Sequence, residues 1–242
     1  MYDWPELTSA HDQFWLDVVS EMGRQGLDSP ATLTSVNDNV AHWLTPELFI
    51  SQTCGYPFAT KLRDKVQLVS TPVYAVEGCG DATYSSAIVV NVDRDMNDLS
   101  RCAEFSFAYN SKDSLSGYRC MKPLVGDPTS VFGSLVESGA HRQSALMVAK
   151  GEADCAAIDS VCWHLFQQFE PEAAARLRVF QWGPVFPALP YITSLQTSPD
   201  QVSKMRSALE TVAESRSSNF AALRLAGFKT LDAAHYFPLA DL

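Results

Sequence analysis

Segments with the pattern of β-strands alternate with helical segments along the whole chain, and this alternation constrains the fold more than any other feature. Residues 84–92 (Tyr-Ser-Ser-Ala-Ile-Val-Val-Asn-Val) form a continuous run rich in β-branched residues, which indicates a buried strand. Residues 6–26 carry apolar side chains at helical spacing and end at Gly26. Because alternating strands and helices pack as layers, the sequence predicts an α/β protein with mostly parallel sheets.

Two segments are predicted to connect one lobe of the protein to another. These are residues 90–104 and the proline-rich residues 183–191, where closely spaced prolines exclude a helix. Two crossings imply that one lobe is inserted in the other. The sequence therefore predicts a two-lobed fold, with residues 1–92 and 192–242 in lobe one and residues 93–191 in lobe two. The predicted strands are residues 66–74, 84–92, 105–109, 154–158, 177–181 and 191–195. The predicted helices are residues 6–26, 45–50, 130–137, 142–151, 161–169, 199–215 and 219–226.

The charge of the chain limits the classes of partner that it can bind. The formal net charge of −10 argues against nucleic acid or an anionic membrane surface. A small anion is still a possible ligand, because local dipoles decide the affinity of a buried site. No apolar run reaches the roughly 18 residues that a membrane-spanning helix needs. We therefore expect a small-molecule ligand and no insertion in a membrane.

The six cysteines do not form a recognisable metal or redox motif. No two of them have the C-x-x-C spacing, so we expect neither a zinc site nor a redox pair, and no cofactor. Cys54 and Cys79 both lie in turn-like segments, which raises the hypothesis of a disulfide bridge between them. Cys155 and Cys162 stand in apolar surroundings and are expected to be buried thiols.

The stretch Phe105–Tyr118 contains the clearest candidate for a binding site. Phe105, Phe107 and Tyr109 alternate with small residues, as in a strand, and the hydroxyl-rich turn Asn110–Gly117 follows at the predicted start of a helix. Backbone N–H groups at a helix start have no partner within the helix. Together with serine hydroxyls and the positive end of the helix dipole, they favour an oxyanion. Ser and Asp also cap helices in the absence of any ligand, so oxyanion binding and simple capping both remain open.

Four further polar turns follow predicted strands or precede predicted helices. In open α/β sheets, ligands bind beyond the carboxyl ends of the strands. Turns of this kind are therefore where a site is expected. The five turns are Gln52–Tyr56, Tyr84–Ser86, Asp113–Tyr118, Gly139–Ser144 and Asp159–Ser160.

Three segments carry a resemblance to a known family. They are Gln52-Thr-Cys-Gly-Tyr-Pro57, Asn110-Ser-Lys-Asp-Ser-Leu-Ser-Gly-Tyr118, and Gly151-Glu-Ala-Asp-Cys-Ala-Ala-Ile-Asp-Ser160, the last being close to a G-x-A-D-x-A-x-I-D motif. The chain resembles, from end to end, the phosphonate/phosphate-type substrate-binding proteins of ABC transporters. These proteins have the type II periplasmic binding protein fold. The resemblance implies a cleft between two α/β lobes that closes on an anion.

The resemblance also implies which residues bind the ligand. The family's anion turn matches Ser114, Leu115, Ser116 and Gly117, and its histidine at a helix start matches His141. The family's aspartate at a strand end matches Asp159, and its glycine–tyrosine loop matches Gly55 and Tyr56. Tyr84 and Ser85 lie near the implied hinge. The full set of predicted ligand-binding residues is Thr53, Gly55, Tyr56, Tyr84, Ser85, Ser114, Ser116, Gly117, Tyr118, His141 and Asp159.

The chemistry of these side chains suits such roles. The hydroxyls of Ser114 and Ser116 can donate to phosphoryl oxygens, together with the N–H groups of Ser116 and Gly117. His141 can donate to the same anion, and does so better when protonated. Asp159 would accept from an amino group on the ligand, or orient His141.

Each of these residues also has a structural explanation that needs no ligand. His141 and Asp159 occur at helix starts, where both residue types are common as surface or capping residues. Tyr56 and Trp163, which could cover an apolar or cationic part of a ligand, are more often core aromatics.

The interpretation that follows is a solute-binding protein, not an enzyme, that captures a phosphonate, phosphate or phosphate ester for ABC-type uptake. We expect a monomer whose partner is an ABC permease. An enzyme using Cys54, His141 and Asp159, a cytoplasmic sensor and an interaction module with a vestigial cleft remain alternatives. The resemblance implies a periplasmic location. The N-terminal segment Met1–Glu6 has neither a basic nor an apolar signal region, so no signal peptide is predicted and a cytoplasmic location stays open.

Overall fold

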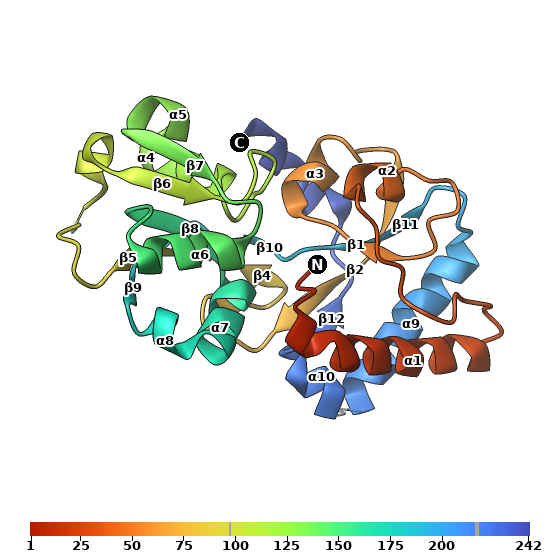
Figure 1. Cartoon of the computed structure of the whole chain (residues 1–242). Coiled ribbons are helices and arrows are strands. Elements are labelled where there is room, and N and C mark those ends of the chain that lie inside the picture. The colour runs from red at the N-terminus through yellow and green to blue at the C-terminus, as the bar shows by residue number, and fades with distance from the viewer. Residues whose placement is uncertain (97, 216–217) are drawn as a thin grey trace. The chain divides into compact units, whose positions relative to one another are not determined.

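The computed structural model describes residues 1–96, 98–215 and 218–242, and the chain divides into two compact units (Figure 1). Each unit has its own sheet and its own helices, which confirms the predicted α/β class. The first unit consists of Met1–Ala75, Gly80–Ala82 and Pro187–Ala240, and the second of Val76–Cys79, Thr83–Phe186 and Asp241–Leu242.

The first unit is built on a four-stranded sheet with the order β1-β11-β2-β12. β11 pairs antiparallel with both β1 and β2, and β12 pairs antiparallel with β2. Helix α1 contacts α9 and α10, and both of these contact β12. The elements are α1 (Thr8–Arg24), α2 (Asn39–Trp43), β1 (Ser51–Gln52), α3 (Gly55–Ala59), β2 (Val66–Tyr74), β11 (Tyr191–Ser194), α9 (Pro199–Ser215), α10 (Ser218–Ala222) and β12 (Leu225–Lys229), with short 3₁₀-helices at Pro5–Leu7, Ala233–His235 and Phe237–Asp241.

Helix α1 shows how the sequence pattern leads to packing in this unit. Its buried residues include Phe14, Val18 and Met22, which recur at helical spacing. The helix ends because Gly26 adopts a φ of 68°, a left-handed conformation that glycine reaches without strain. The N–H group of Leu27 then donates to the carbonyl of Met22 at 3.0 Å, which satisfies one of the last carbonyls of the helix.

The second unit is built on a five-stranded sheet with the order β7-β6-β8-β5-β9. β6 runs parallel to both β7 and β8, whereas β5 is antiparallel to β8 and β9. Helices α6, α7 and α8 contact one another, and α6 also contacts β5, β6 and β8 (Figure 1). The elements are β5 (Ser86–Asn91), β6 (Ser106–Tyr109), α4 (Lys122–Val125), α5 (Pro128–Val131), β7 (Ser134–Glu137), α6 (His141–Lys150), β8 (Cys155–Asp159), α7 (Ser160–Phe169), α8 (Pro171–Ala174) and β9 (Leu177–Trp182), with 3₁₀-helices at Leu99–Glu104 and Arg119–Met121.

Strands β5 and β8 form the centre of the core in the second unit. Every residue of both strands is buried, as expected for strands covered on both faces. The small side chains of Ala156 and Ala157 in β8 allow α6 to lie close to the sheet, where it buries Ala145, Val148 and Ala149. This close packing fixes the first residue of α6 relative to the ends of the strands.

Three short strands form a further sheet where the chain passes between the units. They are β3 (Cys79–Gly80), β4 (Thr83–Tyr84) and β10 (Phe186–Pro187), in the order β10-β4-β3. The predicted first crossing near residue 92 would put β5 in lobe one. In the structure β5 belongs to the second unit, because it pairs with β8 and β9 along its length. The later crossing falls at Phe186 and Pro187, inside the proline-rich segment.

Several sequence-based expectations need correction. The sheets are not mostly parallel: parallel pairing joins β6 to β7 and β8, and the other long strands pair antiparallel. Residues 130–137 contain the end of the short helix α5 and then strand β7, not one helix, because residues 134–137 pair with β6. Residues 45–50 form a turn, and the nearby helix is α2. The helix predicted at 219–226 ends at Ala222, and β12 follows.

All six cysteines are thiols in the structure, so the hypothesised bridge between Cys54 and Cys79 is not formed. Within the described parts of the chain, no group of three or more His, Cys, Asp or Glu side chains is arranged to hold a metal ion. The same parts contain no helix that is both long and apolar enough to cross a bilayer.

Candidate functional site

The carboxyl ends of three parallel strands lie at one edge of the sheet in the second unit. Asn110 follows β6, Ser138 follows β7 and Ser160 follows β8. In this register Ala108 of β6 lies opposite both Val136 of β7 and Ala156 of β8, so the three strands end close to one another. A ligand site is expected at such an edge, and most of the predicted polar turns of this unit lead from it.

The turn Ser114–Tyr118, called the serine turn below, is a single helical turn capped by its own first residue. The carbonyl of Ser114 accepts from the N–H groups of Tyr118 at 3.2 Å and Arg119 at 3.0 Å. The Oγ atom of Ser114 accepts from the N–H group of Gly117 at 3.0 Å, which is the bond of an N-cap residue. From the sequence, the Gly117 N–H group is expected to donate to a ligand. In the structure it donates to Ser114 instead.

His141, the first residue of α6, lies directly against the serine turn. Its Nε2 atom is 2.8 Å from the Oγ atom of Ser116, and that Oγ atom is 3.5 Å from the Oγ atom of Ser114. A Cβ atom on Gly117 would lie 3.1 Å from His141 Cε1, so these residues are in close contact. The structure thus brings together four of the predicted site residues, which are separated by up to 27 positions in the sequence (141 − 114).

The imidazole of His141 is neutral at physiological pH. Burial lowers its pKa from 6.5 to about 4, and the nearby backbone carbonyl of Ala157 opposes this shift only in part. The side chain is partly exposed, yet its Nδ1 atom is buried. His141 therefore forms its hydrogen bond with Ser116 as a neutral ring, and not as the imidazolium that would be the better donor to an anion.

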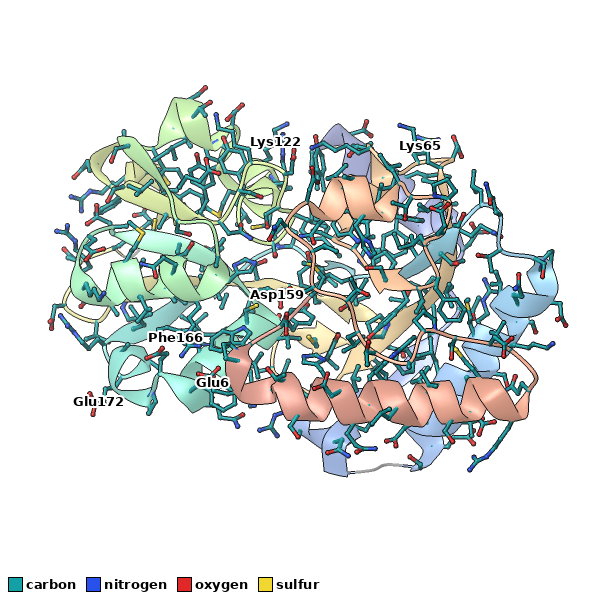
Figure 2. The ribbon with its side chains drawn as sticks, turned by 45° about the vertical axis from the view of Figure 1, so that its right-hand side comes forward. Glu6, Lys65, Lys122, Asp159, Phe166 and Glu172 are labelled. Carbon is teal, nitrogen blue, oxygen red and sulfur yellow. The ribbon has the colours of Figure 1, made fainter. Side chains whose placement is uncertain are left out.

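Asp159 caps helix α7. Its Oδ1 atom accepts from the N–H groups of Val161 at 2.8 Å and Cys162 at 3.3 Å, and its side chain is fully buried. Figure 2 shows Asp159 at the start of this helix, with Phe166 further along it. Asp159 therefore has the capping role that was the alternative to ligand binding.

Ser85 is hydrogen-bonded through its backbone to Ser160, in the turn between β8 and α7. Its carbonyl accepts from both the N–H group and the hydroxyl of Ser160, and its own hydroxyl donates to the carbonyl of Gly78 at 3.2 Å. The neighbouring Tyr84 is buried, with its ring centroid 6.5 Å from that of Phe186. Ser85 and Tyr84 are thus held in the core of the second unit, next to the β8–α7 turn.

The two other aromatic residues singled out in this unit also pack in the core. Tyr118 is buried, its ring meets that of Tyr109 edge-on at 5.0 Å, and its hydroxyl donates to Asp127 at 3.4 Å. Trp163 is buried and stacks on Phe166 at a centroid distance of 5.9 Å. Tyr118 therefore supports the serine turn from within the core.

Three of the predicted residues belong to the first unit, at the start of α3. Thr53 is fully buried, and its N–H group donates to the carbonyl of Pro190 at 3.0 Å. Gly55 is the first residue of α3, and Tyr56 follows it with a partly exposed side chain. Of these, Tyr56 has the side chain best able to meet a ligand.

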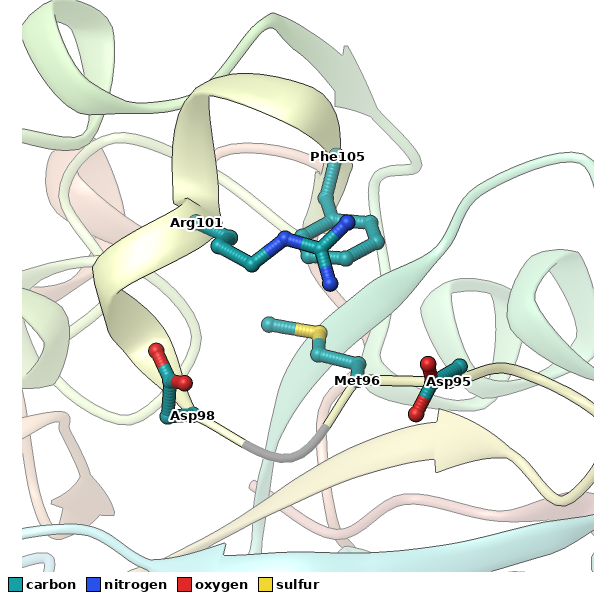
Figure 3. Close-up of a pocket in the computed structure, with 5 residues that line it drawn as sticks. All are labelled: Asp95, Met96, Asp98, Arg101 and Phe105. Carbon is teal, nitrogen blue, oxygen red and sulfur yellow. The ribbon is translucent and has the colours of Figure 1, made fainter.

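A small cavity lies elsewhere on the second unit and contains none of the predicted residues. Its volume is about 190 Å³, and its lining residues are Asp95, Met96, Asp98, Arg101 and Phe105. Figure 3 shows the Arg101 guanidinium group beside the Phe105 ring, 5.9 Å from the ring centroid. Arg101 is also ion-paired with Glu104 at 2.6 Å, so its charge is already compensated.

Asn110 lies against the serine turn, but the sequence-based set of site residues omits it. Its Oδ1 atom is buried and occupies the position that a Cβ atom on Gly117 would need, at a distance of 1.9 Å. The sequence shows Asn110 only as the first residue of a polar turn. Its contact with Gly117, seven positions later, depends on the path of the loop between them.

Comparison with known families identifies the chain. The family model described as "ABC transporter, phosphonate, periplasmic substrate-binding protein" matches residues 48–236. The chain belongs to this family. The predicted resemblance is therefore confirmed, and so is the expectation that the protein is of the substrate-binding type.

Solved structures of this phosphonate-binding family and its neighbours have the same fold. A binding protein of an ABC phosphonate transporter from Pseudomonas aeruginosa is 20% identical, with a TM-score of 0.75 over 96% of this chain and 80% of that chain. PhnD1 from Prochlorococcus marinus, solved with methylphosphonate, is 16% identical, with a TM-score of 0.75 over 96% and 92% of the two chains. A Xanthomonas citri protein solved with ATP is 16% identical, with a TM-score of 0.71 over 97% and 96%.

These similarities confirm the predicted type II periplasmic binding protein fold. No curated protein sequence matches the chain.

Proposed function

We propose that this protein captures a small phosphonate, or a related phosphate oxyanion, at the serine turn and delivers it to an ABC permease. The observation that carries the proposal is the contact between Ser116 and His141 beside the capped turn of Ser114 and Gly117. Membership of the phosphonate-binding family supports this ligand class, as does the methylphosphonate found in the Prochlorococcus marinus protein.

The donors for the anion would come from the two serines and the backbone. The Oγ atom of Ser114 accepts from Gly117, which leaves its hydroxyl proton for a ligand oxygen. With its proton on Nε2, neutral His141 donates to Ser116 and leaves the Ser116 hydroxyl proton for the ligand; with its proton on Nδ1, it accepts from Ser116 instead. Hydrogen bonds to a charged group are worth about 1.5–3 kcal/mol each, so two or three suffice for useful affinity.

The other predicted residues have more peripheral roles in this proposal. Gly55 and Tyr56, the first two residues of α3, are ligand contacts on the strength of the family resemblance alone. The carboxylate of Asp159 caps α7 through its Oδ1 atom. It would accept a hydrogen bond from an amino group on the ligand in addition to these capping bonds. We further propose that the protein is not an enzyme, and that it acts as a periplasmic monomer.

Isothermal titration calorimetry on the whole chain tests the proposal. Methylphosphonate and inorganic phosphate should bind, and a sulfonate of the same size serves as the comparison ligand. The double variant Ser116→Ala/His141→Ala should lose about 10-fold or more in affinity. Ser134→Ala, which alters an exposed serine of β7 in the same unit, is the matched control and should bind normally. Absence of phosphonate binding by the wild type, or unchanged binding by the double variant, would contradict the proposal.

A further inference from the structure

Gly117 of the serine turn is held between two side chains. A Cβ atom at this position would lie 1.9 Å from Asn110 Oδ1, 2.8 Å from Asn110 Cγ and 3.1 Å from His141 Cε1. Real Cβ atoms do not approach oxygen so closely, so the amide of Asn110 fills the space that a side chain at Gly117 would occupy. The contact places Asn110, Gly117 and His141 in one packed group.

The amide oxygen of Asn110 is in an unusual state for an asparagine in a turn. Asn residues in turns commonly use this oxygen to accept from a backbone N–H group nearby in sequence. Here Oδ1 is buried and has no hydrogen-bond partner among the residues that the structure describes. Because buried polar atoms are nearly always paired, an unpaired one indicates that the side chain is held in place for a reason other than its own hydrogen bonding.

The consequence of this packing is the position of Ser116. Gly117 follows Ser116 directly, and the Oγ atom of Ser116 meets Nε2 of His141 at 2.8 Å. If the Asn110 side chain were absent, Gly117 could shift toward β6, and the Ser116 hydroxyl would move away from His141. The amide oxygen also faces the Cα–H group of Gly117, a weakly attractive arrangement that a methyl group could not provide.

We propose that Asn110 is a positioning residue of the oxyanion site, acting through Gly117 to hold the Ser116 hydroxyl against His141. The identity of the ligand in this inference rests on the proposed function. The placement of Ser116 by Asn110 does not depend on any ligand. It also explains why a neutral amide suits the position. An aspartate has the same shape, but its charge would stand beside the hydroxyls that are to receive an anion.

The first test is a double-mutant cycle on Asn110 and Gly117, with methylphosphonate affinity measured by calorimetry. Asn110→Ala should weaken binding about 10-fold, and Gly117→Ala about 100-fold, because its methyl group would collide with the amide. The double variant should bind better than Gly117→Ala by about 10-fold, since the methyl group then enters the space that the amide has left. Losses that simply multiply in the double variant would overturn the proposal.

The second test is Asn110→Asp, which keeps the shape and adds a charge, so it remains informative if Gly117→Ala does not fold. At a pH low enough to protonate the carboxyl, its urea midpoint should match that of the wild type at the same pH. At neutral pH its affinity should be about 10-fold or more below that of the wild type, and this difference should shrink as the pH is lowered. A purely structural role predicts no such pH-dependent recovery, and wild-type affinity across the pH range would overturn the proposal. Asn37→Ala, at an exposed loop position, is the matched control.

A readout that needs no ligand separates this inference from the proposed function. In Asn110→Ala, the NMR signals of the Ser116 and Gly117 amides and of the His141 ring nitrogens should shift, because the hydrogen bond between Ser116 and His141 is weakened. If the wild type binds no phosphonate but these signals shift, the proposed function fails and the positioning role stands. If the wild type binds and the signals stay unchanged, the positioning role fails alone.

Discussion

His141 Nε2 and Ser116 Oγ are 2.8 Å apart, so the first residue of α6 and the loop after β6 meet at one hydrogen bond. The bond joins two segments that the sheet brings together, because β6 and β8 are parallel neighbours and α6 packs on both. Through this hydrogen bond, a neutral imidazole can fix the orientation of the Ser116 hydroxyl without adding a charge to the site. The pair is therefore expected to behave as a unit in ligand binding.

A double-mutant cycle on this pair measures that coupling. Ser116→Ala and His141→Ala should each weaken methylphosphonate binding about 10-fold, whereas the double variant should be no more than about 3-fold weaker than the worse single variant. The physical reason is that removal of either partner already releases the hydroxyl from its productive orientation. Calorimetry gives the affinities. Independent action, with the two losses multiplying, would show that His141 contacts the ligand separately from Ser116.

The pH dependence of folding follows from the lowered pKa of His141. Between about 4 and 6.5, the folded and unfolded values of its pKa, the unfolded chain binds a proton that the native protein does not. The associated stability is complete above this range and is lost as the pH falls through it. A shift of this size corresponds to about 3 kcal/mol for a fully buried group, and the partial exposure of the ring reduces it.

Urea unfolding of the wild type and of His141→Asn across this range checks the prediction. The wild type should lose more stability than the variant on acidification, since the variant lacks the titrating ring. An NMR titration of the ring gives the pKa directly. A pKa near the ordinary value of 6.5, with parallel pH profiles for the two proteins, would contradict it.

Two substitutions at Asp159 separate its capping role from any contact with a ligand. Asp159→Ala should reduce the free energy of unfolding by about 1 kcal/mol, because the N–H groups of Val161 and Cys162 lose their acceptor. Asp159→Asn keeps an oxygen acceptor and should cost only a few tenths of that amount. If the carboxylate also contacts an amino group on the ligand, Asp159→Asn should weaken the binding of an aminoalkylphosphonate and leave the binding of methylphosphonate unchanged. Equal losses for both ligands would assign the effect to the fold.

Elements with strong local patterns were predictable from the sequence, and those that depend on distant pairing were not. Strand β2 and helix α9 occupy the predicted residues, because the buried run of the one and the helical spacing of the other are local. β7 and β12 were mistaken for helices because their strand conformation comes from pairing with β6 and β2. The antiparallel course of β5 likewise depends on its partners β8 and β9.

The same distinction applies to the site. Ser114, Ser116, Gly117 and His141 come from the family resemblance and lie in turns that the strand-end rule also marks, and the structure places them together. The neutral state of His141 depends on burial, which its position at a helix start does not reveal. The role of Asn110 depends on the space left by a missing Cβ atom, a property of the folded loop.

Gly78 provides a final prediction, because its substitution combines backbone strain with a steric collision. Its φ is 82°, and an added Cβ atom would lie 2.3 Å from Trp182 Cζ3 and 2.7 Å from Ser160 Oγ. Gly139 has the same φ of 82° but nothing within 4 Å of such an atom, so it is a matched control. Gly139→Ala should cost about 1 kcal/mol through backbone strain, and Gly78→Ala about 2–4 kcal/mol, as the ring and the β8–α7 turn must move. Urea unfolding measures both, and equal losses would mean that the collision is relieved without cost.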